Sequence, residues 1–243
     1  DVETVNLTFT DTSTSTVNSD TMTLNAAAAT AVTVAGNSNV NLSMGTSTAV
    51  TSINASAMTK ALTVTSLNTT AATTITGGSG NDLLTAATGT TADVLIGGAG
   101  DDTLTANAGL NTLTGGAGND MFVIGTASLN SSSYATITDF AAGDLIKMTG
   151  ATSFRAAAIT QADTAVFQDY ANAAINAIGA NAAAWFQYNG NTYVVMDAGA
   201  DTATFTNGQD FIVKLSGLVD LTNASFNSKI GRASCRERVS SPV

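Results

Sequence analysis

Short apolar runs recur throughout the first half of the chain, separated by segments rich in Thr, Ala, Asn and Ser. Within a run such as Leu62-Thr63-Val64, aliphatic and polar residues alternate, which is the period-two pattern of a strand with one buried face. The residues expected to point inward follow one another at intervals of nine to eleven positions: Val32, Leu42, Ile53, Val64, Ile75, Leu84, Leu95, Leu104, Leu113 and Phe122. This spacing predicts one parallel β-solenoid, in which short strands stack along a narrow apolar column.

The strands expected before residue 77 are short, and no full sequence repeat accompanies them. They comprise 4–7, 22–24, 32–34, 40–42, 50–53, 62–64 and 73–75. Strands of this length and spacing also suit a β-sandwich, so a sandwich is the alternative for residues 1–76. We favour an irregular solenoid there, because the inward positions continue almost without a break into the repeats that follow.

A nine-residue motif then occurs in three intact copies, at 77–85, 97–105 and 115–123. Each copy reads G-G-x-G-x-D-x-U-x, where U is a large apolar residue. The glycines allow positive φ angles and let carbonyl oxygens approach one point, and the aspartate adds an anionic oxygen. Oxygen ligands on a flexible turn suit Ca²⁺ better than Zn²⁺ or Mg²⁺. The motif resembles the calcium-binding nonapeptide of RTX proteins.

The spacing of the copies predicts which of them stack. Two nonapeptides form one coil of a β-roll, so the intervals of 20 and 18 residues place all intact copies on one edge. Two complete calcium sites are expected between them, with Asp82, Asp102 and Asp120 as side-chain ligands. The degraded repeats place Asp93 and Asn111 on the opposite edge, where we expect one weaker site or none. The candidate ligands on the intact edge are Gly77, Ser79, Asn81, Asp82, Gly97, Ala99, Asp101, Asp102, Gly115, Ala117, Asn119 and Asp120.

Behind the repeats, segment 137–148 predicts a strand, a turn and a second strand that close the open end of the stack. Asp139 and Asp144 fall in its turn. Each of them either caps the turn or completes a terminal calcium site, and capping is the role we favour. The fold class predicted is all-β: a right-handed parallel β-solenoid, or calcium β-roll, followed by a small β-rich C-terminal cap.

The remaining sequence predicts one helix and further strands in that cap. A helix is expected at 161–180, where apolar residues recur on one face as core. A β-hairpin is expected at 185–196, because its Asn-Gly dipeptide suits the positive φ angles of a type I′ turn. Its aromatic residues are interpreted as core rather than as a sugar-binding platform. Two more β-rich segments, 210–215 and 218–221, finish the cap.

Composition narrows the functional classes. The chain has 243 residues, a formal charge of −10 and no histidine. The negative charge argues against a nucleic-acid partner, which requires a basic stripe. The missing histidine removes Ser-His-Asp triads and zinc-protease motifs. No run is long enough for a transmembrane helix. We therefore expect a chain that is not an enzyme, binds no nucleic acid and does not insert into a membrane.

The end of the sequence, 229–243, differs from all that precedes it. It holds four of the eight basic residues, the only cysteine and the only proline. We interpret it as vector-derived sequence and exclude it from the expected fold. Residue 1 lies inside a strand-like pattern, so we also expect a fragment that lacks its native start.

Beyond the repeats, the sequence resembles the C-terminal region of the RTX-type surface-layer (S-layer) proteins of stalked freshwater alphaproteobacteria. The likeness rests on residues 2–6, 49–57, 137–139, 185–188, 192–195 and 213–219. It implies a calcium-dependent subunit of a cell-surface lattice, whose partners are Ca²⁺ and copies of itself. It also implies export by a type I secretion ABC transporter that reads an uncleaved C-terminal signal. The location implied is the extracellular surface of a Gram-negative bacterium.

Two other hypotheses place the function outside this sequence. The chain is then the C-terminal carrier and secretion region of an RTX enzyme or of an RTX adhesin, whose functional domain lies upstream. The genomic sequence upstream distinguishes the three hypotheses. The expected division of the chain is an irregular solenoid at 1–76, the calcium β-roll at 77–125, the cap and secretion region at 126–228 and the vector-derived tail at 229–243.

Overall fold

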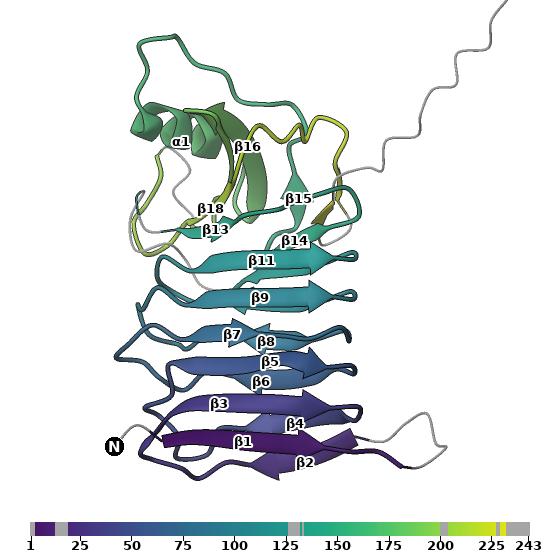
Figure 1. Cartoon of the computed structure of the whole chain (residues 1–243). Helices are drawn as coiled ribbons and strands as arrows, with labels where there is room; N and C mark the ends of the chain where they lie inside the picture. Colours follow the sequence, from purple (N-terminus) through teal and green to yellow (C-terminus); the bar gives the residue numbers. More distant parts are fainter. Residues whose placement is uncertain are drawn as a thin grey trace, which may run out of the picture.

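The chain folds into a stack of short strands with a small mixed module at one end (Figure 1). The structure is a computed structural model and describes residues 3–12, 19–125, 132, 134–199, 204–226 and 229–231. Successive strands of the stack alternate between two sheets, which gives a β-solenoid of about six turns. The predicted fold class, mostly β with one helix among the described residues, is confirmed.

Odd-numbered strands of the solenoid form one sheet and even-numbered strands form the other. The first sheet holds β1 (Glu3–Phe9), β3 (Ala29–Gly36), β5 (Ser52–Met58), β7 (Thr74–Thr76), β9 (Val94–Ala99), β11 (Thr112–Ala117) and β13 (Ala135–Ile137). The second sheet holds β2 (Ser19–Thr23), β4 (Asn39–Ser43), β6 (Leu62–Thr65), β8 (Leu83–Thr85), β10 (Thr103–Ala106), β12 (Met121–Ile124) and β14 (Leu145–Met148). Neighbours within each set pair in parallel, so the N-terminal part is a solenoid rather than the alternative sandwich.

The core of the solenoid is the apolar column that the sequence predicts. Each coil contributes at least one inward residue from each sheet, because side chains alternate across a strand. In the first sheet, the residues in register are Val32, Ile53, Ile75, Leu95 and Leu113. In the second sheet, they are Leu42, Val64, Leu84, Leu104 and Phe122. All ten side chains are exposed by 2% or less, so the predicted inward positions are confirmed.

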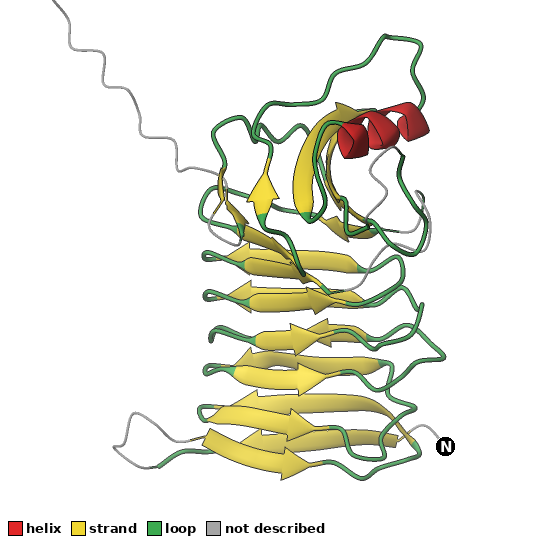
Figure 2. Ribbon diagram, turned by 180° about the vertical axis from the view of Figure 1, so that it is seen from behind, coloured by secondary structure: helices red, strands yellow, loops and turns green. Residues whose placement is uncertain are grey.

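The C-terminal module continues the first sheet beyond the solenoid. Strand β18 (Phe211–Leu215) pairs in parallel with β13, and β17 (Asn191–Met196) pairs antiparallel with β18. Strand β16 (Ala182–Tyr188) forms a hairpin with β17 and pairs on its other side with β15 (Ser153–Phe154). Helix α1 (Phe167–Asn176) lies beside this hairpin, at the end of the molecule opposite the N-terminus (Figure 2). Among the described residues, no helix has the length and apolar character needed to cross a bilayer.

The predicted hairpin and its aromatic core are confirmed. Asn189 and Gly190 have φ angles of 46° and 74°, as a type I′ turn requires. Phe186 stacks on Tyr193 with ring centroids 5.4 Å apart, and both side chains are buried. Phe167 of α1 meets Tyr193 edge-on at 4.9 Å. These rings hold the helix against the sheet, which is a core role.

The predicted helix is longer than the one observed. We expect a helix at 161–180, whereas α1 begins at Phe167 and ends at Asn176. The carboxylate of Asp169 accepts the N–H of Val166 at 2.9 Å, which fixes the start of the helix there. Asn181 has a φ angle of 60°, so the chain turns away shortly after the helix ends.

Two other segments differ from the structure predicted for them. Residues 218–221 form no strand, because the hydroxyl of Thr192 satisfies both backbone groups of Val219: it accepts the N–H at 2.8 Å and donates to the carbonyl at 3.0 Å. Segment 137–148 does not close the stack. Its strands β13 and β14 instead extend both sheets by a further coil.

Residues 229–231 belong to the segment interpreted as vector-derived, yet they lie in the fold. Strand β20 (Ile230–Gly231) pairs antiparallel with β14 and with β19 (Ser225–Phe226). The side chain of Ile230 is buried, because it continues the apolar column opposite Ile146. The prediction that these three residues lie outside the fold was therefore wrong. The division of the chain at residues 76, 125 and 228 stays a prediction.

Adjacent leucines in β8 provide a direct test of the column. Leu84 is fully buried, whereas the side chain of Leu83 is 41% exposed. We expect Leu84→Ala to lower the free energy of unfolding by about 2–5 kcal/mol, because it leaves a cavity in the column. Leu83→Ala is the matched control and should change it by about 0.5 kcal/mol or less. Denaturant unfolding followed by circular dichroism measures both, and equal losses would contradict the assignment of the inward face.

Candidate metal centre

The intact nonapeptides stack along one edge of the solenoid. Residues 77–82 run from β7 to β8, 97–102 from β9 to β10, and 115–120 from β11 to β12. Because the flanking strands pair in parallel and in register, these turns lie one above another at the right-hand edge in Figure 1. The predicted placement of the three intact copies on one edge is confirmed.

The aspartates of these turns form a series of hydrogen bonds between coils. The backbone N–H of Asp82 donates to Asp102 Oδ1 at 2.7 Å, and the N–H of Asp102 donates to Asp120 Oδ1 at 2.9 Å. The same bond joins the N–H of Asp120 to Asp144 Oδ1 at 2.9 Å. At the other end, Leu62 N–H donates to Asp82 Oδ1 at 2.7 Å. We call Asp82, Asp102, Asp120 and Asp144 the aspartate ladder; all four side chains are buried.

The second carboxylate oxygen distinguishes the middle turn from the first. Asp82 Oδ2 accepts the N–H of Gly78 at 2.7 Å. Asp102 Oδ2 is buried and has no hydrogen-bond partner. The two turns share a motif but differ in backbone conformation, since Gly98 has a φ of 115° and Gly78 lies outside the positive region. A buried carboxylate oxygen without a partner is costly, so Asp102 is the point of this edge where a ligand is needed.

A carbonyl oxygen of the neighbouring coil converges on the same place. A Cβ at Gly97 would collide with Asp102 Oδ2 and with the carbonyl oxygen of Gly115. A Cβ at Gly77 would likewise collide with Asp82 Oδ2 and with the carbonyl oxygen of Gly97. The first glycine of the motif is therefore required, because oxygens occupy the space of its side chain. Carboxylate and carbonyl oxygens are the ligands that Ca²⁺ takes, so the residues present fit calcium.

The ladder concentrates like charge in a poorly solvated place. Burial is the main cause that raises the pKa of Asp102 to about 7, and the charges of Asp82 and Asp120 contribute to this rise. The pKa of Asp120 is raised to about 6, first by burial and then by neighbouring acidic residues. Burial is also the main cause that raises the pKa values of Asp82 and Asp144. Among the described residues, no basic side chain acts on these four carboxylates, which favours either protonation or a bound cation.

The residues that precede the ladder aspartates form a second, exposed series. Asp101 N–H donates to Asn81 Oδ1 at 3.0 Å, and Asn119 N–H donates to Asp101 Oδ1 at 2.7 Å. These bonds run in the opposite direction to those of the aspartate ladder. Asn81 and Asp101 therefore use side-chain oxygens to hold the turns together at the surface. The role of Asn81, Asp101 and Asn119 as calcium ligands stays a prediction.

The third residue of each motif joins neighbouring coils through its backbone. Ser79 and Ala99 donate their N–H groups to carbonyl oxygens of the preceding coil at 3.0 and 2.9 Å. The carbonyl oxygen of Ala117 accepts the N–H of Gly100 at 2.8 Å. These positions keep the turns in register, and their role as ligands also stays a prediction.

The opposite edge carries a similar series, in which the polar side-chain atoms of Asp93 and Asn111 all have hydrogen-bond partners. Thr73 N–H donates to Asp93 Oδ1 at 2.7 Å, and Ala87 N–H donates to Asp93 Oδ2 at 2.9 Å. Asp93 N–H donates to Asn111 Oδ1 at 2.9 Å. The amide nitrogen of Asn111 donates in turn to the carbonyl oxygen of Asn107 at 3.0 Å. The hydrogen bonds of Asp93 and Asn111 thus leave no unpartnered oxygen comparable to that of Asp102.

The coil after the repeats supplies two acidic residues that complete the edge. Asp139 accepts the N–H groups of Gly115 and Gly116 at 3.0 and 2.8 Å. Asp144 accepts the N–H of Ala141 at 2.8 Å as well as its ladder bond. Asp144 thus caps its own turn, the role favoured from the sequence, whereas both bonds of Asp139 go to the turn of the preceding coil. The membership of Asp144 in the ladder was not expected, because its interval of 24 residues from Asp120 breaks the nonapeptide spacing.

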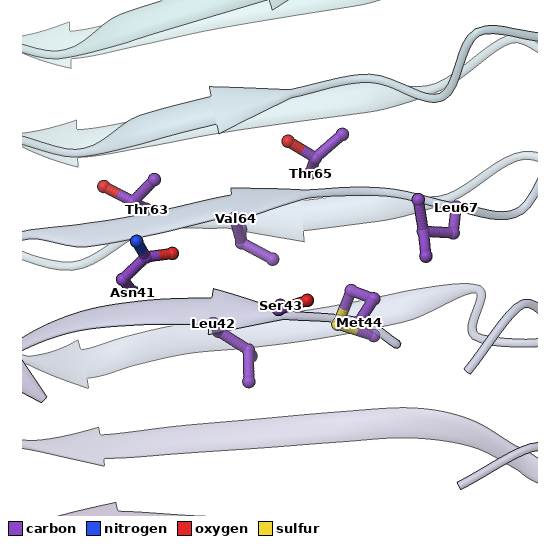
Figure 3. A pocket seen from close by; sticks show the side chains of 8 residues that line it. All are labelled: Asn41, Leu42, Ser43, Met44, Thr63, Val64, Thr65 and Leu67. Atoms are coloured by element: carbon purple, nitrogen blue, oxygen red, sulfur yellow. The ribbon is translucent and has the colours of Figure 1, made fainter. Parts of the chain in front are cut away.

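The ladder carboxylates do not gather into a compact cluster of metal-binding side chains. Among the described residues, no three carboxylate, imidazole or thiolate side chains gather to hold a metal. Calcium at the ladder would therefore depend on backbone carbonyls in addition to aspartate. A depression over β4 and β6 is shown in Figure 3, and none of its lining residues is ionisable: Asn41, Leu42, Ser43, Met44, Thr63, Val64, Thr65 and Leu67.

Comparison with known families identifies the repeats. Residues 69–90 and 87–122 match the family model described as RTX calcium-binding nonapeptide repeat (4 copies). The matched stretch contains the three intact turns and the degraded turn at Asn111. No curated protein matches the chain. The chain thus contains RTX calcium-binding nonapeptide repeats, and proteins with such repeats are typically secreted.

The raised pKa of Asp102 predicts how pH acts on calcium-free protein. Its folded value of about 7 exceeds the ordinary 3.8, so between these values the folded state binds more protons than the unfolded state. The free energy of unfolding should therefore fall as pH rises through this window. Circular dichroism of metal-free protein should show more strand structure at pH of about 5 than at about 8. Asp102→Asn should flatten this dependence, and a signal that increases with pH would contradict the assignment.

The two edges should differ in their dependence on a carboxylate. Asp102→Asn removes the unpartnered anionic oxygen, and Asn111 shows that such a series accepts an amide. We expect calcium affinity to fall by roughly tenfold or more, which corresponds to ~1.4 kcal/mol. Asp93→Asn is the matched control, since both oxygens of Asp93 already accept hydrogen bonds. Calorimetric titration with Ca²⁺ measures the affinity of both variants. Equal losses of affinity would show that the unpartnered oxygen is not the binding group.

Proposed function

We propose that this chain is part of a secreted, calcium-binding structural protein, and that it serves as the calcium-dependent subunit of a cell-surface (S-layer) lattice. The observation that carries the proposal is the buried, unpartnered oxygen of Asp102 within a ladder of like charges. A structural role needs this edge to hold coils together, which is what the hydrogen bonds of the ladder do.

Calcium would couple the folding of the solenoid to its location. Without a cation, the ladder carboxylates repel one another across coils. The desolvation free energy that their burial costs is then only partly compensated. Extracellular calcium-binding modules have dissociation constants on the order of 10⁻⁴ to 10⁻³ M, far above free calcium in the cytosol. The chain would therefore pass unfolded through a type I secretion ABC transporter and fold outside the cell.

The lattice assignment rests on the architecture together with the sequence resemblance. The column of inward residues runs from the first coils through the repeats without a change of fold. A continuous solenoid of this kind suits a rigid building unit, and it binds Ca²⁺ at its edge and copies of itself in the lattice. The alternative is a carrier region for a secreted enzyme or adhesin, in which case the repeats serve export alone.

The experiment is a calcium titration of the full chain with two readouts. After removal of metal with a chelator, strand structure measured by circular dichroism should be lost and should return with millimolar calcium. Asp102→Asn should need more calcium for the same signal, because the anionic ligand is gone. A spectrum that chelator leaves unchanged would contradict calcium-dependent folding.

Assembly is followed in the same samples by sedimentation and electron microscopy. Ordered sheets that form with calcium support the lattice. Folded protein that stays monomeric at every calcium concentration, with a catalytic or adhesive domain encoded upstream, would replace the lattice by the carrier function.

A further inference from the structure

A second pair of buried aspartates lies in the C-terminal module, outside the nonapeptides. Asp197 directly follows β17 and Asp210 directly precedes β18. The last pair of that antiparallel ladder joins Met196 to Phe211, so the two aspartates flank the point where the strands separate. Asp197 is 0% exposed and Asp210 is 1% exposed. The register of the sheet thus brings together two acidic residues that are distant in sequence.

Backbone amides hold the two carboxylates side by side. Ala198 N–H donates to Asp210 Oδ1 at 3.0 Å, and the next amide, Gly199 N–H, donates to Asp197 Oδ1 at 2.9 Å. Thr206 N–H donates to Asp210 Oδ2 at 2.7 Å. Burial raises the pKa of Asp210, and the charge of Asp197 raises it further. The two acids are therefore close enough to repel each other.

One oxygen of this pair has no partner. Asp197 Oδ2 is buried and accepts no hydrogen bond. Within the described parts of the chain, no basic group acts on Asp210, and the one charge that acts on it is that of Asp197. A Cβ at Gly199 would meet Gln209 Oε1 at 3.3 Å and Asp197 Oδ1 at 3.7 Å. One carboxylate oxygen and one amide oxygen therefore approach Gly199, as a carboxylate and a carbonyl oxygen approach the first glycine at the ladder.

We propose that Asp197, Asp210 and Gln209 form a separate cation site that takes Ca²⁺ and fastens the junction of β17 and β18. Oxygen-only donors of mixed charge and irregular arrangement suit Ca²⁺, whereas Zn²⁺ favours nitrogen and sulfur ligands and Mg²⁺ demands a regular octahedron. Because β18 also pairs with β13, a cation here would stiffen the connection between the module and the solenoid. The site is independent of the nonapeptides and of the lattice.

Counting bound calcium in the full chain tests the site. Native mass spectrometry with Ca²⁺ should show one ion fewer for Asp197→Asn than for the unaltered chain. The amide keeps the volume of the carboxylate and can still accept the Gly199 N–H, so the module should stay folded. Asp163→Asn, which removes an exposed acid of the same module, is the matched control and should lose none. An unchanged calcium count in a folded Asp197→Asn protein would overturn the proposal.

Two further measurements keep the result interpretable. Gln209 is exposed, so Gln209→Leu should fold normally and should weaken this one site roughly tenfold in calorimetry, about 1.4 kcal/mol. Unchanged calcium affinity in that variant would remove Gln209 from the site. Asp102→Asn should lose calcium at the ladder only, so the losses in a combined Asp102→Asn and Asp197→Asn protein should add. If the ladder binds no calcium, the ion lost with Asp197→Asn still identifies the second site.

Discussion

The hydrogen bond from a backbone amide of one coil to an aspartate of the next is the interaction on which this solenoid depends. Strands such as β7 and β8 have three residues each, and so short a ladder specifies its own register weakly. The bond from Asp82 N–H to Asp102 Oδ1 fixes where each strand begins. Because the next strand starts directly after its aspartate, the apolar residue of each coil in the ladder falls on the column.

One carboxylate oxygen thus accepts a backbone amide. The hydrogen bonding of the second side-chain atom differs among three cases in this molecule. Asp82 turns it toward a glycine amide of its own turn. Asn111 replaces it with a nitrogen that donates to a carbonyl. Asp102 and Asp197 leave it buried without a partner. In the first two cases the backbone supplies the hydrogen-bond partner, so no ligand is required. In the third case a bound cation would compensate the buried, unpartnered oxygen.

The sequence predicted the column and the stacked edge well, because both follow from spacing alone. It could not distinguish the turn at Asp82 from the turn at Asp102, since the same motif adopts different φ angles at its second glycine. It also missed the pairing of Asp197 with Asp210, which exists only through the register of β17 and β18. Such features depend on contacts between distant segments, so local pattern carries no signal for them.

The buried polar side chains are neutral in the first coils and mostly acidic in the repeats. Calcium is therefore expected to act on the coils of the repeats. In the first coils the turns bury neutral side chains: Ser47 donates to the carbonyl oxygen of Leu24 at 2.9 Å, and Asn68 donates to that of Val50 at 3.2 Å. These groups are satisfied without any ion, and no described residue before Asp82 is a buried charge that needs to be neutralised. Among the described residues, buried acids enter the turns only where the repeats begin. The neutral coils therefore provide an ordered edge on which the calcium-dependent coils can stack, since each coil of a solenoid contacts only its neighbours.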